Sequence, residues 1–521
     1  MIWTIAKREF LDKILDFRVT ISFITAIVLT SVVTIVSGED YLVRKAEYDK
    51  EVALQLSLLN NAKVYSEYNP VVFYPPTPLC VFSHGIDIPT PITAEIVIYN
   101  VPFYSPRVAG LNPIMNMFDT LDILLVVRVL FSLLVILLTF DAFSGEKELG
   151  TLRQVLSNPT KRGSILLGKF FGTMMILGTV ICLTFLFALI ILGGFVGVSL
   201  SMGEVIRLGL IAGLTILYLA VFAGLGILGS IMLHRSAVSL AVLLLIWFFV
   251  AVFQPELNTY IVSEFDDRQW VDAYRSANAQ NDCDVETELA NLQKQSGGIL
   301  TDSTKHIFWE APGRSSSVGY GSFTMYKSVT DADPDILDYL ISQVRLFRQL
   351  KNCGDKDNEL YNSLCLTHLN QQLAFKRQLE FVSPAALFSH GIGIFSQTDI
   401  DNIDAFYDQV RRYRESYFSF LDQKGVFSTD AQLYFSRLRR DQLSSEATNA
   451  RIAAYLKDRS SIPWNANCPP LDLRDAPAFA AQGSDILQDF NKVVPIFLLL
   501  FLYLILFLIA TVWSLQLYDP R

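Results

Sequence analysis

The chain has 521 residues, of which 51% are hydrophobic and only 18% are charged. A soluble chain of this length would carry about 25% charged residues and would not collect its apolar residues in long blocks. The formal net charge of −9 argues against a nucleic-acid partner. The composition therefore predicts a membrane protein that binds no nucleic acid.

The first eighteen residues, MIWTIAKREFLDKILDFR, show an amphipathic pattern. Ile2, Ala6, Phe10 and Ile14 recur at helical spacing, and charged side chains fill the opposite face. No small-residue cleavage site follows, as a signal peptide would require. We expect residues 1–18 to form a cytoplasmic helix on the membrane surface; the alternative is an ordinary polar extension.

Six apolar blocks are each near the roughly 17–25 residues that cross a bilayer. We expect an all-α polytopic membrane protein with an N-terminal amphipathic helix and a mostly helical extracytoplasmic domain. The six transmembrane helices are predicted at 19–36, 121–140, 164–198, 205–233, 237–253 and 493–515.

Lys and Arg residues near the span ends gather on one side of the predicted membrane. They are Lys7, Arg8, Lys13, Arg18, Lys147, Arg153, Lys161, Arg162, Arg235 and Arg521. Short loops rich in Lys and Arg stay in the cytoplasm. We therefore expect a protein of the plasma (inner) membrane with both termini cytoplasmic, and a tail at 516–521.

Two long polar segments, 37–120 and 254–492, are predicted on the extracytoplasmic side. The first holds a proline-broken extended run and a strand-like alternation at 94–103. The second is large enough for a domain of its own and has mostly helical periodicity, for example at 399–421.

The cysteines agree with an oxidising location for these segments. Four lie in the second segment, where they would form two disulfides: Cys283, Cys353, Cys365 and Cys468. Three pairings are open. Cys353–Cys365 with Cys283–Cys468 is favoured because it nests a short loop in a long one, and unpaired thiols are the alternative.

The pentapeptide FSHGI occurs twice, at 82–86 and 388–392, each time after a proline. We expect a membrane-proximal turn or helix start in both places. His84 and His390 could share a metal, but neither has a third ligand at a recognisable spacing. Hydrogen-bonded histidines in an interfacial turn are the simpler interpretation.

Charges inside the spans are few, so each is a functional candidate by default. Arg128 is the clearest, in the outer part of the second span. It is predicted either to extend its side chain outward to water or to face a subunit interface or substrate path. Lys169 and Arg207 lie near span ends, where extension to the membrane surface would suffice.

The loop after the second span, 141–163, carries the most distinctive sequence, DAFSGEKELGTLRQVLSNPTKRG. Glu146 and Glu148 are predicted in the first turn of a short helix, where the helix dipole favours carboxylates. Gly150 would permit close approach of another backbone. Leu149, Leu152, Val155 and Leu156 form an apolar stripe that requires a partner surface, and Asn158-Pro159 ends the helix.

The stretch GSILLGKF, 163–170, resembles a phosphate-binding loop but lacks its essential parts. Such a loop follows a strand and places Ser or Thr after the lysine, to bind magnesium. Phe170 occupies that position and a membrane span follows. The sequence therefore predicts no nucleotide site, no bound cofactor and no catalytic residue in this chain.

The motifs GEKELGTL, SNPTKR and ILLGK around this loop resemble the permeases of ABC-2-type ATP-binding-cassette transporters. SPAALFSHGIGIF also resembles the external domain of a subgroup of these permeases. The resemblance implies an exporter that works as a dimer with a second permease copy, identical or related. A separate ATPase subunit would bind the ATP and grip a cytoplasmic coupling helix. Glu146, Glu148, Gly150 and Thr151 occupy the motif, and Pro159, Arg162, Gly168 and Lys169 mark the return to the membrane.

Two other classes compete. A membrane-anchored scaffold or sensor would bind a partner through its extracytoplasmic domain without transport, but it would have no need of a docking helix. A membrane-embedded enzyme would require a His/Glu metal motif or a Ser/His pair, and the spans carry neither.

Overall fold

The computed structural model describes residues 2–60, 70–85, 93–96, 122–152, 154, 161–263, 374–424 and 473–517, together with isolated residues between 272 and 371. Six helical stretches in this part are long and apolar enough to cross a membrane. They are Val19–Ser57, Ile123–Glu148, Arg162–Val196, Met202–Met232, Ser236–Asn258 and Ile486–Leu517. The prediction of an all-α polytopic membrane protein is confirmed.

The elements follow one another along the chain as α1 (Ile2–Ile14), α2 (Phe17–Asn60), β1 (Val71–Phe73), the 3-10 turn η2 (Pro78–Val81) and β2 (Thr93–Glu95). The second span consists of α4 (Ile123–Leu125), the π-helical η4 (Val126–Phe131) and α5 (Ser132–Thr139), and α6 (Ser144–Glu148) follows it. Then come α8 (Arg162–Ile190) with η5 (Ile191–Val196), α9 (Met202–Met232), and α10 (Ser236–Trp247) with η6 (Phe248–Phe253) and α11 (Gln254–Ser263). The last helices are α15 (Pro384–Ser396), α16 (Ile400–Gln423) and α18 (Ile486–Leu517).

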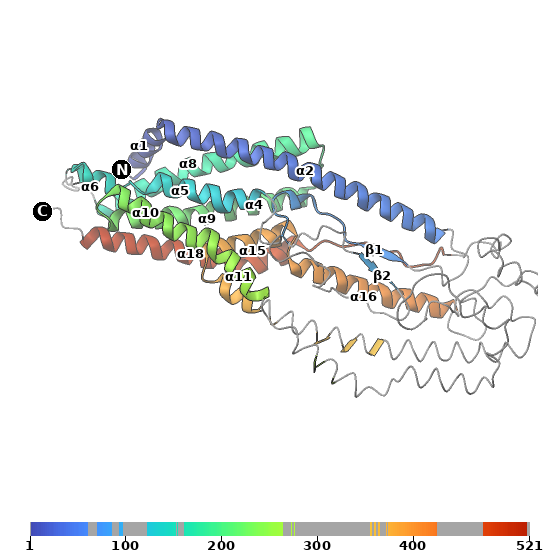
Figure 1. Ribbon diagram of the computed structural model, residues 1–521. Coiled ribbons are helices and arrows are strands. Elements are labelled where there is room, and N and C mark those ends of the chain that lie inside the picture. The colour runs from blue at the N-terminus through green and yellow to red at the C-terminus, as the bar shows by residue number, and fades with distance from the viewer. Residues whose placement is uncertain are drawn as a thin grey trace, which may run out of the picture.

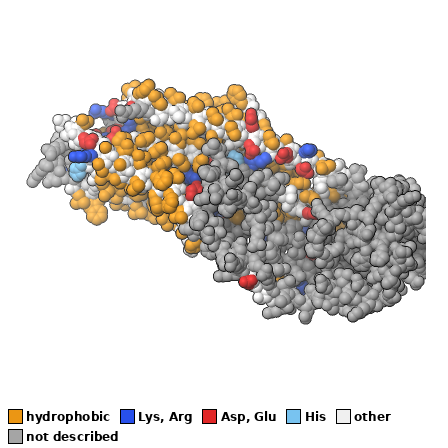
Figure 2. All heavy atoms as spheres, viewed as in Figure 1, with side chains coloured by type: hydrophobic (Ala, Val, Ile, Leu, Met, Phe, Trp, Pro, Cys, Tyr) orange, Lys and Arg blue, Asp and Glu red, His pale blue; other side chains and the backbone are white. Residues whose placement is uncertain are grey.

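The spans lie side by side, and the bundle has two distinct ends (Figure 1). Both termini and α6 lie at one end, which we call the loop end (residues 2–15, 141–152, 161–165, 233–236 and 513–517). The β strands and α16 lie at the opposite end, which we call the domain end (70–85, 93–96 and 397–424). Hydrophobic side chains cover the visible face of the bundle, and charged side chains gather toward its two ends (Figure 2). Such a belt suits a bilayer.

Helix α9 occupies the centre of the bundle and packs against α18, α15, α5 and α8. Ser201 begins it with a capping box, in which the Ser201 hydroxyl accepts from the Glu204 amide and the Glu204 carboxylate accepts from the Ser201 amide. Tyr218 and Phe222, at the middle of the helix, are almost completely buried. Most of the apolar core forms around this helix.

Helix α2 is far longer than the span expected at 19–36. Its 44 residues rise about 66 Å at 1.5 Å per residue, whereas the hydrocarbon core of a bilayer is about 30 Å thick. The helix therefore continues well beyond the membrane, into the segment predicted to begin at residue 37.

Helix α15 belongs to the bundle, although the sequence places it in the polar segment 254–492. It packs against α9 and α18, Phe388 stacks on Tyr218 with 4.2 Å between ring centroids, and nearly all of its residues are buried. Ser383 caps its N-terminus and also donates to the Val250 carbonyl at 2.9 Å. The apolar composition of PAALFSHGIGIF explains this burial, so the boundaries of a separate domain exclude α15.

A second, smaller core lies at the domain end. The short strands pair antiparallel, with Val72 opposite Ala94. One face of α16, including Ile403, Phe406 and Val410, packs in the same buried cluster. The helix predicted at 399–421 is present as α16. Of the strand-like stretch 94–103, the structure describes residues 94–96, and residues 94–95 lie in the three-residue strand β2.

The two FSHGI copies differ in conformation. Phe82 to Gly85 follow the 3-10 turn η2, whereas the second copy lies in the interior of α15 rather than at a turn or helix start. His84 Nε2 lies 3.8 Å from Asp40, and His390 Nδ1 lies 2.7 Å from Glu380. Each histidine thus has its own carboxylate, and the described residues contain no group of three or more side chains arranged to hold a metal.

The predicted disulfides fall on residues that the structure does not describe. Cys283, Cys353, Cys365 and Cys468 all lie outside the described ranges, so their pairing stays a prediction. Within the described part, Cys80 is buried and Cys182 is exposed on α8.

Candidate functional site at the loop end of the bundle

Helix α6 is a single short turn that ends in an exposed loop. It spans Ser144–Glu148, and Gly150 follows with a left-handed φ of 71°. This turn favours glycine because of its left-handed conformation, and within this chain a Cβ at Gly150 would meet nothing within 4 Å. Leu149 is 79% exposed, while Leu152 is buried. The expected apolar stripe is therefore split between the surface and the core.

The predicted docking element is described in part. Thr151 and Leu152 are helical, and the Thr151 hydroxyl donates to the Glu146 carbonyl at 3.3 Å. Val155, Leu156 and Pro159 lie outside the described residues.

Glu148 lies at the last position of α6, not in a favourable first turn as the sequence suggested. Its carboxylate instead accepts from the amide and hydroxyl of Ser236, at 3.0 and 2.8 Å. Ser236 is the first residue of α10. A carboxylate is stabilised at a helix N-terminus, where backbone N–H groups lack partners inside the helix, so Glu148 ties α6 to α10.

Helix α6 is also fixed to the end of α9. The amides of Phe143 and Ser144 both donate to the Ser230 hydroxyl, at 2.8 and 2.9 Å. Lys147 donates to the carbonyls of Ile231 and Leu233, the last acceptors of α9. A cation at a helix C-terminus is stabilised by those carbonyls.

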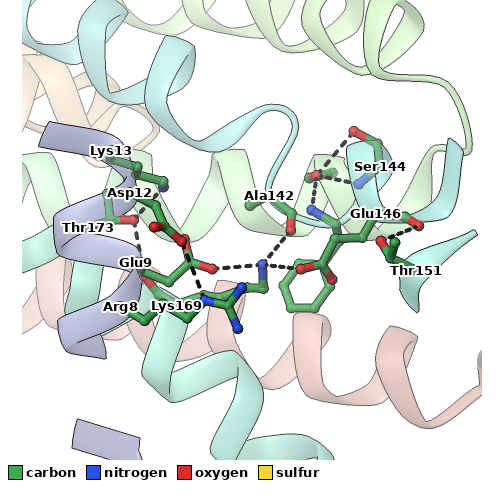
Figure 3. Close-up of polar contacts among 12 residues, drawn as sticks. Arg8, Glu9, Asp12, Lys13, Ala142, Ser144, Glu146, Thr151, Lys169 and Thr173 are labelled. Atoms are coloured by element: carbon green, nitrogen blue, oxygen red, sulfur yellow. Dashed lines mark hydrogen bonds and ion pairs between the residues drawn. The ribbon is translucent and has the colours of Figure 1, made fainter. Parts of the chain in front are cut away.

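Lys169 forms the charged centre of the site (Figure 3). Its ammonium donates to Glu9 at 2.9 Å, to Glu146 at 2.8 Å and to the Ala142 carbonyl at 2.9 Å. The residue is 5% exposed. The expectation that Lys169 extends to the membrane surface is therefore wrong, because two carboxylates compensate its charge inside the protein. Three elements, α1, α6 and α8, meet at this one side chain.

Helix α1 packs closely along α8. A Cβ at Gly172 would lie 2.7 Å from the Glu9 side chain and 2.9 Å from the Ala6 carbonyl, and one at Gly168 would lie 2.7 Å from Ile5. Glycines four residues apart thus let the two helices touch. The amphipathic helix is present as predicted, but its Ala6 side is buried against the bundle.

Lys13 adds a second polar contact between α1 and the spans. Its ammonium donates to the Leu138 carbonyl at 2.8 Å and to the Thr173 hydroxyl at 3.1 Å. Burial lowers the pKa of Lys13 below its ordinary value, against the opposing influence of Glu9. The charged face of α1, which the sequence assigned to solvent, therefore carries contacts to the second and third spans.

The start of α8 is linked to the last span, since Arg162 Nη1 donates to the Leu515 carbonyl of α18 at 2.7 Å. The stretch GSILLGKF is part of the continuous helix α8. A helical stretch whose lysine is held by two carboxylates is not a phosphate-binding loop.

Arg128 lies in the π-helical turn η4 and is buried. Its guanidinium is 3.1 Å from Glu256 of α11, and Tyr218 of α9 donates to the Arg128 carbonyl at 2.8 Å. The side chain therefore pairs within this chain instead of extending outward to water. Single π-helical turns inside helices are frequent at functional sites, and this one joins three spans.

Comparison with known proteins identifies the family. The profile of the ABC-2 family transporter proteins matches residues 3–291, which is more than half of the chain. The chain therefore belongs to the ABC-2 family of transporter proteins.

A curated relative is similar over a short stretch. The probable ABC transporter permease protein NosY of Stutzerimonas stutzeri is 46% identical over 56 residues, which is 11% of this chain and 20% of that relative. The similarity thus spans only a fifth of the relative's length.

The close packing of α1 gives a first prediction. Gly172→Leu places a branched side chain against Glu9 and the Ala6 backbone and should detach α1 from α8. Limited proteolysis after Lys7 or Arg8 should then become several-fold faster. Gly178→Leu is the matched control, because a Cβ at Gly178 in the same helix meets nothing within 4 Å. Equal proteolysis in both variants would contradict this packing.

The buried charges give a second prediction. Lys169→Met leaves Glu9 and Glu146 without their cation and should destabilise the protein by about 3–5 kcal/mol. The triple variant Glu9→Gln, Lys169→Met, Glu146→Gln should recover part of the loss, as measured by thermal unfolding of the purified full chain. Arg8→Met, which removes an exposed pair with Asp12, is the control and should cost less than about 1 kcal/mol. An unchanged thermal unfolding temperature of the Lys169→Met variant would contradict the assignment of Lys169 as the cation that compensates Glu9 and Glu146.

Proposed function

We propose that this chain is the membrane-spanning permease subunit of an ABC exporter, driven by a separate ATPase that docks on the loop after α6. One observation carries the proposal. Leu149 and Gly150 follow a helix that is bound to three neighbouring helices. Leu149 is 79% exposed, while Glu148, Lys147 and Glu146 are bound to α10, α9 and α8.

An exposed leucine at the tip of an anchored turn is suited to insert into an apolar groove of a partner. Force applied at this tip would reach α10 through Glu148, α9 through Lys147 and Ser230, and α8 with α1 through Lys169. The Ser230 contacts are buried, those of Lys147 and Lys169 are partly buried, and those of Glu148 are exposed. With three neighbouring helices bound at once, α6 would move with the bundle end rather than slide past it.

Orientation and assembly belong to the same proposal. The loop end lies in the cytoplasm, with both termini, and the domain end lies outside the plasma membrane. ATP is bound and hydrolysed on the partner subunit, and two permease copies form the pathway. The basic residues near the loop end and the family membership support this arrangement.

The exposed tip gives the third prediction. Leu149→Glu should reduce co-purification of the ATPase subunit at least tenfold, because it places a charge where an apolar contact is expected. The folded chain should be unaffected, since Leu149 touches little of it. Leu517→Glu is the control: Leu517 is 73% exposed at the same end of the bundle and lies outside the proposed docking loop.

If the Leu149→Glu chain co-purified as much ATPase subunit as the unchanged chain, the docking role would be contradicted. It would favour the alternative of an anchored scaffold or sensor that works without a motor.

A further inference from the structure

A second buried ion pair lies at the domain end of the bundle. Arg207 of α9 pairs with Asp489 of α18, and these residues are 4% and 0% exposed. The expectation that Arg207 extends to the membrane surface is wrong, because its charge is compensated inside the protein. The pair joins the fourth and sixth spans where the sequence predicts the extracytoplasmic side.

The same guanidinium also holds the turn that follows α15. Arg207 donates to the Ser484 carbonyl at 2.6 Å and to the Phe395 carbonyl at 3.5 Å. When the Gln397 amide is oriented so that its oxygen faces the neighbouring donors, this oxygen accepts a hydrogen bond from the Arg207 guanidinium at 3.2 Å. Gln397 adopts a left-handed φ of 60°, which is uncommon for a residue other than glycine.

The segment between α2 and the second span closes on this turn from another direction. Tyr74 donates to the Gln397 carbonyl at 3.1 Å, and Thr77 donates to the Ser396 carbonyl at 3.1 Å. Gly85 touches Thr398 so closely that a Cβ would lie 2.2 Å from its carbonyl oxygen. The turn 396–398 is therefore where three parts of the chain meet at the domain end.

The polar atoms at this contact are buried, but some of them lack hydrogen-bond partners. Asp489 Oδ1, Ser396 Oγ and Thr398 Oγ1 are buried without a hydrogen-bond partner in the described part of the chain. A buried polar atom without a partner costs free energy, and water would satisfy these atoms if the end opened. A closed contact with unmet hydrogen bonds is therefore less stable, relative to an open one, than a fully satisfied contact would be.

We propose that the Arg207–Asp489 pair, with the turn 396–398, is a latch that holds the domain end closed and opens in each transport cycle. The inference rests on the proposed transport function. Breaking the pair would free the ends of α9 and α18 nearest the domain end from each other, and would loosen the turn 396–398 together with the segment 74–85. The closure would then lie at one end of the bundle and the docking site at the other, and α9 would couple them.

The latch can be tested without the ATPase. In the full chain in lipid nanodiscs, Ser396→Cys introduces a thiol at a position that is 0% exposed. Its labelling by a membrane-impermeant maleimide is measured against the same chain without that substitution. Asp489→Asn should accelerate labelling about tenfold, because it leaves Arg207 without its counter-ion. The labelling rate of the double variant Arg207→Gln, Asp489→Asn should lie between the rates of Asp489→Asn and of the parent chain.

Arg411→Gln is the matched control, because Arg411 pairs with Asp408 of the same helix, α16, and its ion pair links no two elements in the described part of the chain. It should label at the parent rate. An unchanged labelling rate in folded Asp489→Asn protein would overturn the latch, whether or not an ATPase binds.

A second measurement applies even if Asp489→Asn fails to fold. Gln397→Cys and Ser484→Cys replace side chains whose amide oxygen and hydroxyl oxygen lie 2.8 Å apart. Joining the two thiols with a short bis-maleimide in the assembled permease–ATPase complex should reduce ATP hydrolysis several-fold relative to the unlinked complex. Undiminished hydrolysis in the linked complex would overturn the latch. Absence of any ATPase complex, with accelerated labelling of Asp489→Asn, would instead count against the proposed function and leave the latch standing.

Discussion

The loop end of the bundle depends on one buried charge. Lys169 lies inside an apolar bundle, where an unpaired ammonium would be strongly unfavourable, and it is compensated by Glu9 and Glu146. These carboxylates come from α1, which also packs along α8 at Gly168 and Gly172, and from α6. The need to neutralise Lys169 therefore adds to this packing and joins the N-terminal helix and the loop after the second span at one point of α8.

Both ends of the bundle contain a buried ion pair, but the hydrogen bonds around the two pairs differ. At the loop end, the Lys169 ammonium donates to three acceptors and so uses all of its hydrogens. At the domain end, one oxygen of Asp489 and the nearby hydroxyls of Ser396 and Thr398 lack partners among the described residues. At the loop end, Glu146 Oε2 is likewise buried without a partner among the described residues. The cation is thus fully satisfied there, and more of the surrounding polar atoms lack partners at the domain end, which fits a closure that opens at that end.

The spans and the amphipathic helix could be predicted from sequence because they depend on long apolar blocks and helical spacing. The ion pairs could not, since each joins residues far apart in the chain: Glu9 with Lys169, Arg128 with Glu256 and Arg207 with Asp489. Treating Lys169 and Arg207 as side chains that reach water ignored carboxylates on other helices. Helix α15 was missed as part of the bundle because its 13 residues are too short for a span. The position of Glu148 in a first helical turn was wrong, because α6 ends at this residue.

The central claim is that the tip at Leu149 faces the cytoplasm and is covered by a separate ATPase. The most direct test is the labelling of Leu149→Cys by a membrane-impermeant maleimide in sealed vesicles of both orientations, with and without the ATPase subunit. The account predicts labelling only in inside-out vesicles and protection when the ATPase is present. Labelling in right-side-out vesicles, or labelling that the ATPase leaves unchanged, would contradict it.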